Sequence, residues 1–67
     1  MKNMYSFRFN VGGFKIIINV ISDSIESSAK KAYERCADNV GDAFKSKALN
    51  GDYLQGVDVT RDVLTDN

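Results

Sequence analysis

The side chains that could carry chemistry in this chain are carboxylates, amines and a single thiol. The 67 residues include no histidine and one cysteine, Cys36, so the usual nitrogen and sulfur ligand spacings of metal sites are missing. A nucleophile activated by histidine is excluded within one chain for the same reason. Cys36 falls among apolar positions, which predicts a buried thiol and not a reactive one. We expect no catalytic residue, no metal site and no cofactor, and these absences disfavour an enzyme.

Three carboxylates recur at four-residue spacing, which would place them along one side of a helix. They are Glu34, Asp38 and Asp42, and they are interspersed with the bases Lys30, Lys31, Arg35 and Lys45. Side chains three or four residues apart on a helix are neighbours, and opposite charges at this spacing form a solvated, ion-paired face. We favour that interpretation over a site for a divalent cation.

Residues 5–20 predict a β-hairpin whose register is fixed by its turn. Large apolar side chains occupy odd positions up to Val11 and even positions from Phe14 onward, with Gly12 and Gly13 between them. Two glycines readily adopt the positive φ angles of a type I′ turn, and a two-residue loop pairs residues whose numbers sum to 25. The alternating apolar residues then share one face of the hairpin.

The segment after the hairpin predicts one long helix. Residues 22–24, Ser-Asp-Ser, offer three N-caps in succession, and an apolar stripe at helical spacing runs through residues 25–44. The phase of the stripe survives Gly41, so we expect a single helix from about residue 24 to the mid-forties, with a kink or short break near Gly41. Residues 50–51, Asn-Gly, form a stop signal.

The remaining segment predicts a third strand. Tyr53, Val57 and Val59 are apolar and alternate with polar residues such as Asp58. Residues 62–67 are either its continuation or a frayed tail. Strand, strand, helix, strand predicts an α+β fold of ββαβ type, in which a three-stranded antiparallel sheet of order 2-1-3 carries the helix on one face. We expect residues 1–67 to form a single small domain.

The faces of these elements predict the core. Its expected members are Tyr5, Phe7, Phe9, Phe14, Ile16, Ile18, Val20, Ile25, Ala29, Ala32, Tyr33, Cys36, Val40, Phe44, Val57 and Val59.

The charge balance bears on the class of partner and on the compartment. Nine basic and nine acidic residues cancel, so no global field draws the chain to nucleic acid or to an anionic membrane. No apolar run is long enough to span a bilayer. One cysteine excludes an intramolecular disulfide and suits a reducing compartment. We expect a soluble, cytoplasmic protein with no membrane partner.

Binding is therefore the expected activity, and three surfaces are candidates for it. They are the sheet face away from the helix, the outer face of the helix, and the free edge of the second strand, which could accept a strand from a partner. On the sheet face we expect the partner-binding residues Arg8, Lys15, Ile17, Asn19 and Ile21. On the helix we expect Lys30, Lys31 and Arg35 as a second group.

The layout resembles a class of small inhibitory proteins. A strand hairpin, a helix that contains Ser28-Ala29-Lys30-Lys31-Ala32 and a final strand are similar in arrangement to small phage-encoded inhibitors of host defence, including some anti-CRISPR proteins. The resemblance covers nearly the whole chain in layout but no specific motif, so no functional residue is carried over from it. It implies a stoichiometric inhibitor that occupies the working surface of a larger protein. Such inhibitors are often strongly acidic, whereas this chain is neutral, which argues against mimicry of DNA.

We therefore predict a non-enzymatic protein-binding module, specifically a phage or mobile-element inhibitor that blocks a bacterial defence complex of CRISPR type. Its partner would be a larger host protein or a protein–nucleic acid complex. Two alternatives stay open: a nucleic-acid-binding regulatory domain, and a structural subunit that self-assembles, for example as a homodimer. The first would use Arg8, Lys15, Lys30, Lys31 and Arg35 on phosphates. It is disfavoured because acids interrupt the bases and no exposed aromatic accompanies them.

Overall fold

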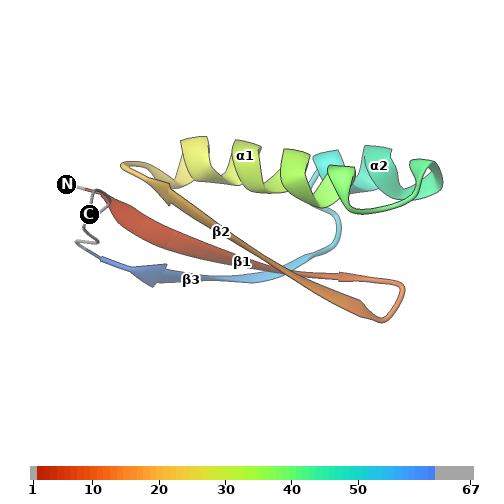
Figure 1. Ribbon diagram of the computed structural model, residues 1–67, viewed down its shortest axis with the longest axis horizontal. Coiled ribbons are helices and arrows are strands. Elements are labelled where there is room, and N and C mark those ends of the chain that lie inside the picture. The colour runs from red at the N-terminus through yellow and green to blue at the C-terminus, as the bar shows by residue number, and fades with distance from the viewer. Residues whose placement is uncertain (1, 62–67) are drawn as a thin grey trace.

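Two layers, a sheet and a pair of helices, make up the structure (Figure 1). It is a computed structural model that describes residues 2–61. The elements follow in the order β1 (Asn3–Val11), β2 (Phe14–Ser22), α1 (Ile25–Asp38), α2 (Asp42–Leu49) and β3 (Leu54–Thr60). The sheet is antiparallel with the order β2-β1-β3, and both helices lie on the same side of it. The predicted α+β class, the strand order and the strand directions are confirmed.

The hairpin has the register that its turn dictates. Paired residue numbers sum to 25 along its whole length, from Asn3 opposite Ser22 to Val11 opposite Phe14. Gly12 and Gly13 have φ angles of 58° and 93°, the positive values that a type I′ turn requires at both central positions.

Two helices replace the single long helix that the apolar stripe predicts. The α1 helix begins after Ser24, whose hydroxyl accepts a hydrogen bond from the Ser27 N–H at 3.2 Å. It ends at Asp38, and the chain is extended at Gly41, with φ −69° and ψ 163°, before α2 begins. A continuous helix of about 25 residues would be about 37 Å long, whereas a nine-residue strand spans about 30 Å. The break lets α2 turn back and pack on α1.

The third strand pairs with β1 through a bulge. Tyr5 lies opposite Val59, but the register shifts between Arg8 and Phe9, so that Phe9 lies opposite Leu54. The strand begins at Leu54, one residue after the predicted start at Tyr53. The question of whether residues 62–67 continue the strand lies outside the described residues.

The core lies between the sheet and α1. Its buried apolar members are Tyr5, Phe7, Phe9, Val11, Val20, Ala32, Cys36, Ala37 and Ala48. Tyr33 of α1 presents its ring edge-on to Phe7 and Phe9, with ring centroids 6.4 and 6.1 Å apart. Such pairs add specific packing to the burial of apolar area. The predicted core members Ile16, Ile18, Ala29, Tyr33, Val40 and Val57 are partly buried against this cluster.

Four predicted core residues are exposed, so the prediction is wrong for Phe14, Ile25, Phe44 and Val59. Phe14 is 77% exposed because it follows the turn at the end of the hairpin, where the sheet diverges from the helices (Figure 1). Ile25 is the first residue of α1, and Phe44 lies on the helix that turned back. Val59 is on β3, whereas α1 packs on β2 and β1. The prediction also omitted the buried residues Val11, Ala37 and Ala48.

Candidate functional site

One face of the sheet carries most of the residues expected to bind a partner. We term it the open face, because no element within residues 2–61 covers it (Figure 1). The pairing register places on it Met4, Ser6, Arg8 and Asn10 of β1, Lys15, Ile17, Asn19 and Ile21 of β2, and Gly56, Asp58 and Thr60 of β3. All five sheet residues predicted as contacts are in this set, because strand parity alone determines the face that each occupies.

Arg8 extends from the central strand across β3. Its Nε atom lies 3.3 Å from Oδ2 of Asp58. Gly56 is the residue opposite Arg8 in the register, and a Cβ at Gly56 would lie 3.0 Å from Cζ of Arg8 and collide with the guanidinium group. The missing side chain therefore makes room for Arg8 on the β3 side. Ile17, its neighbour on the other side, stays 62% exposed.

A small hollow on the open face brings three of the predicted contacts together. Arg8, Lys15, Ile17 and Gln55, with Phe9 and Ile16 beneath, line a volume of about 110 Å³. Two cations border it, and Asp58 offsets one of them, so the local charge is positive. This arrangement suits a carboxylate next to an apolar group on a partner.

The remaining two sheet residues lie further along β2. The Ser6 hydroxyl donates a hydrogen bond to Oδ1 of Asn19 at 2.7 Å, so the Asn19 side chain is held within the sheet. Ile21 is exposed beyond it, opposite Met4. They extend the mixed polar and apolar character of the open face away from the hollow.

The helix residues predicted as contacts do not form one surface with the sheet residues. Lys30 and Lys31 are exposed on α1, on the other side of the sheet from Arg8 and Lys15. Arg35 instead reaches the edge of β2, where its guanidinium group donates to the backbone oxygen of Asn19 at 3.4 Å. The structure thus divides the eight predicted contacts among the open face, the α1 surface and the β2 edge.

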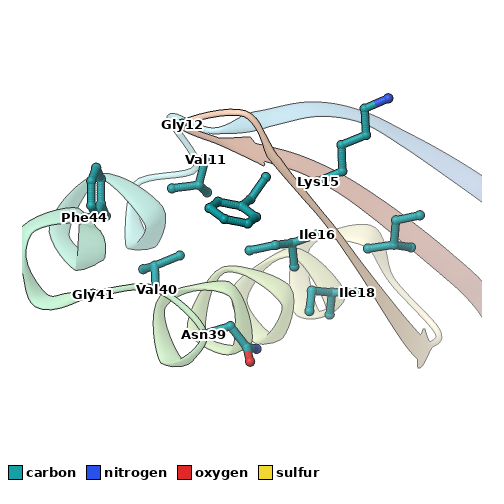
Figure 2. A pocket seen from close by; sticks show the side chains of 11 residues that line it. Val11, Gly12, Lys15, Ile16, Ile18, Asn39, Val40, Gly41 and Phe44 are labelled. Atoms are coloured by element: carbon teal, nitrogen blue, oxygen red, sulfur yellow. The ribbon is translucent and has the colours of Figure 1, made fainter.

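An apolar groove lies between the turn end of the hairpin and the region where α1 is followed by α2 (Figure 2). Its volume is about 710 Å³, and it is lined by Val11, Gly12, Phe14, Lys15, Ile16, Ile17, Ile18, Asn39, Val40, Gly41 and Phe44. Figure 2 shows Val11 and Ile16 on the hairpin side of this space, with Val40 and Phe44 on the helix side. The groove exists because the sheet and helices diverge beyond α1, which leaves the Phe14 ring without a cover.

The sequence pattern contains only an indirect signal for this groove. Phe14 and Phe44 both fit the apolar periodicity of their elements, and that periodicity predicts burial. Only the combination of a helix break at Gly41 with two unmatched aromatic residues could have indicated an open end of the core.

The groups capable of chemistry are dispersed. The Cys36 thiol is fully buried, and burial raises its pKa. Asp42 pairs with Lys45 at 3.3 Å on the surface of α2. In the part of the chain that the structure describes, no three metal-ligating side chains cluster, and no helix is long and apolar enough to cross a membrane.

Comparison with known proteins gives no match, whether with family models, with curated proteins or with solved structures.

Proposed function

We propose that this chain is a non-enzymatic protein-binding module that docks its open face on a folded partner. The observation that carries the proposal is the exposed side chain of Ile17. It lies on β2 opposite Arg8 and two residues from Lys15, and all three side chains line the small hollow. Protein interfaces combine apolar anchors with arginine and exclude water around them. The matching partner surface offers an apolar side chain to Ile17 and a carboxylate to the two cations.

The finer part of the proposal concerns the partner. It is a larger protein or protein–nucleic acid complex of a bacterial defence system of CRISPR type, and this chain is a phage or mobile-element inhibitor that occupies its working surface in the cytoplasm. The support for this part is the resemblance in layout to small inhibitors of host defence. The neutral net charge favours mixed apolar and polar contacts over imitation of DNA.

Direct binding to nucleic acid has less support. Arg8 and Lys15 lie on one side of the sheet and Lys30 and Lys31 on the other, so neither group alone provides a long track of phosphate contacts. The strand aromatics Tyr5, Phe7, Phe9 and Phe14 alternate with the open-face residues and so occupy the helix side. Bases would find no stacking platform among the described residues of the open face.

The test is affinity capture from a bacterial lysate, with and without nuclease, by the unchanged protein and two double variants. Arg8→Glu with Ile17→Asp disrupts the open face. Lys31→Glu with Leu49→Asp makes the same kind of change at exposed positions on the helix layer. Circular dichroism and thermal unfolding establish that each variant is folded.

The proposal expects a stoichiometric partner that is retained after nuclease treatment, lost with the open-face variant and kept with the helix variant. A bound defence complex supports the finer part. Capture that disappears with nuclease and falls steeply with salt contradicts the proposal and favours the nucleic-acid alternative. Equal capture by both folded variants contradicts the assignment to the open face.

A further inference from the structure

The free edge of β2 presents a defined set of unpaired backbone groups. In a two-residue hairpin the pair next to the turn, Val11 and Phe14, is hydrogen-bonded, and hydrogen-bonded pairs then alternate with pairs that are not. Even-numbered residues of β2 therefore direct their N–H and C=O groups toward β1. The odd-numbered residues direct theirs to the outer edge, because β2 is at the end of the sheet. These are Lys15, Ile17, Asn19 and Ile21.

Only part of this edge is protected. Arg35 donates to the backbone oxygen of Asn19 and so covers the half of β2 nearest α1. The other half, residues 14–18, has no such cover within the described chain, and it forms one wall of the apolar groove. An edge of this kind, with free hydrogen-bonding groups beside exposed apolar side chains, is a template for an added strand.

We propose that the added strand is β2 of a second copy, paired antiparallel over residues 14–18 about a two-fold axis at Ile16. Lys15 of each copy then lies opposite Ile17 of the other, and their outward backbone groups form the new hydrogen bonds. The result is a six-stranded sheet with one helix pair over each half. The argument for this assembly does not use the proposed function. The open faces of both copies stay on the side of the joined sheet away from the helices, and Lys15 and Ile17 belong both to the open face and to the new strand pair.

The neighbouring two-fold registers are less favourable. A shift toward the turn places Lys15 opposite Lys15 of the second copy, and like charges directly opposite one another repel. A shift away from the turn places Lys15 opposite Asn19 of the second copy. That register requires the Asn19 backbone oxygen, which Arg35 already occupies. The register centred on Ile16 avoids both conflicts.

This register also brings the exposed Phe14 ring into contact with the second copy. Phe14 of one copy lies opposite Ile18 of the other, on the helix-facing side of the joined sheet, and Ile18 lines the apolar groove. Because the axis is two-fold, each copy inserts Phe14 beside the groove of the other, as an isologous interface requires. Phe14 has the largest exposed fraction among the large apolar residues of the described chain. In the dimer it faces an apolar surface two residues along the strand from the symmetry axis.

The size of the interface is consistent with the groove taking part. A standard interface takes about 800 Å² from each partner, which is about one sixth of the 4539 Å² accessible surface of this chain. A five-residue strand edge alone is too narrow to supply this area. The edge together with Phe14, Val40 and Phe44 forms a continuous surface on one side of the molecule.

The first test is molar mass by sedimentation equilibrium. We expect twice the 7.4 kDa of the chain, and Phe14→Asp should raise the dissociation constant about 100-fold or more, because each dimer loses two buried rings. Leu49→Asp is the control, since Leu49 is exposed and lines a different hollow. A mass of 7.4 kDa up to about 1 mM chain overturns the dimer. Equal dissociation constants for both variants overturn the placement at the groove.

The second test fixes the register. Ile16→Cys should give a disulfide-linked dimer under mild oxidation, because facing residues of a pair without hydrogen bonds have Cα atoms about 4.5 Å apart. Ile17→Cys should not crosslink. In this register position 17 lies opposite Lys15 of the second copy, so the two cysteines would be offset diagonally across the axis. The unchanged protein controls for Cys36, which is fully buried. Crosslinking by Ile17→Cys in place of Ile16→Cys overturns the register.

Discussion

Tyr33 lies so close to Gly51 that a Cβ at position 51 would be 2.9 Å from Cζ of the ring. The same ring meets Phe7 and Phe9 edge-on, so it connects the chain leaving α2 to the buried face of β1. Gly51 also has a φ of 78°, which ends the helix in the left-handed region. Conformation and contact both require glycine at this position.

Gly51→Ala is therefore expected to lower the free energy of unfolding by more than the roughly 1–2 kcal/mol that a left-handed conformation costs a residue with a Cβ. Gly12→Ala is the matched control. Gly12 has a φ of 58°, but a Cβ there would have nothing within 4 Å, so only the conformational cost applies. Urea unfolding of both variants measures the difference. Equal losses of stability in the two variants would show that the Tyr33 ring moves aside without destabilising the fold.

Substitutions at the two helix N-termini are expected to change the free energy of unfolding in opposite directions. Ser24→Ala removes the hydroxyl that accepts from the Ser27 N–H and should cost about 1 kcal/mol. Gly41→Ser adds a hydroxyl where α2 has no side-chain cap and should gain a few tenths of a kcal/mol. Ser27→Ala keeps the backbone donor and serves as the control in the same unfolding measurements. A loss of stability in Gly41→Ser would contradict this account of α2.

The sequence predicts those features that depend on local geometry. The hairpin register follows from the two glycines and the change of apolar parity around them, and strand parity places Arg8, Ile17 and Lys15 on one face without further information. The helix break does not follow in the same way. The apolar phase continues through Gly41, and the break accompanies the packing of α2 on α1, which is a tertiary contact.

The apolar groove is beyond the reach of sequence periodicity for a related reason. The apolar alternation of β2 predicts that Phe14 is covered, and it carries no information about where the helix layer separates from the sheet. The exposure of Phe14 arises because the sheet and the helix layer diverge, and the relative direction of two layers is a tertiary property. The bulge that places Leu54 opposite Phe9 is likewise a property of pairing between distant segments.

The Arg8–Asp58 ion pair is expected to contribute little to folding. Its side chains are 51% and 69% exposed, so solvent screens their attraction. A double-mutant cycle with Arg8→Gln and Asp58→Asn should give a coupling of about 0.2–1 kcal/mol that decreases in high salt. A larger, salt-independent coupling would contradict a screened surface pair. The value of the pair for partner binding is measured separately, by capture with each single variant.

The Cys36 thiol predicts a loss of stability at alkaline pH. Burial raises the pKa of this group in the folded protein above its ordinary value of 9.0. Between those two pKa values the unfolded chain releases the thiol proton while the folded chain retains it, so the free energy of unfolding falls as pH rises. The contribution is fully present below pH 9.0 and decreases above it, with a slope of at most about 1.4 kcal/mol per pH unit.

Urea unfolding from neutral pH to about pH 10 measures this slope, with Cys36→Ala as the control. The control differs from the unchanged protein only at position 36, so the difference between the two curves reports the thiol. Cys36→Ala is expected to be less stable at neutral pH because it leaves a cavity at a fully buried position. Its deficit should become smaller above pH 9.0. A deficit that is constant across the range would show that the thiol ionises as readily in the folded protein as in the unfolded chain.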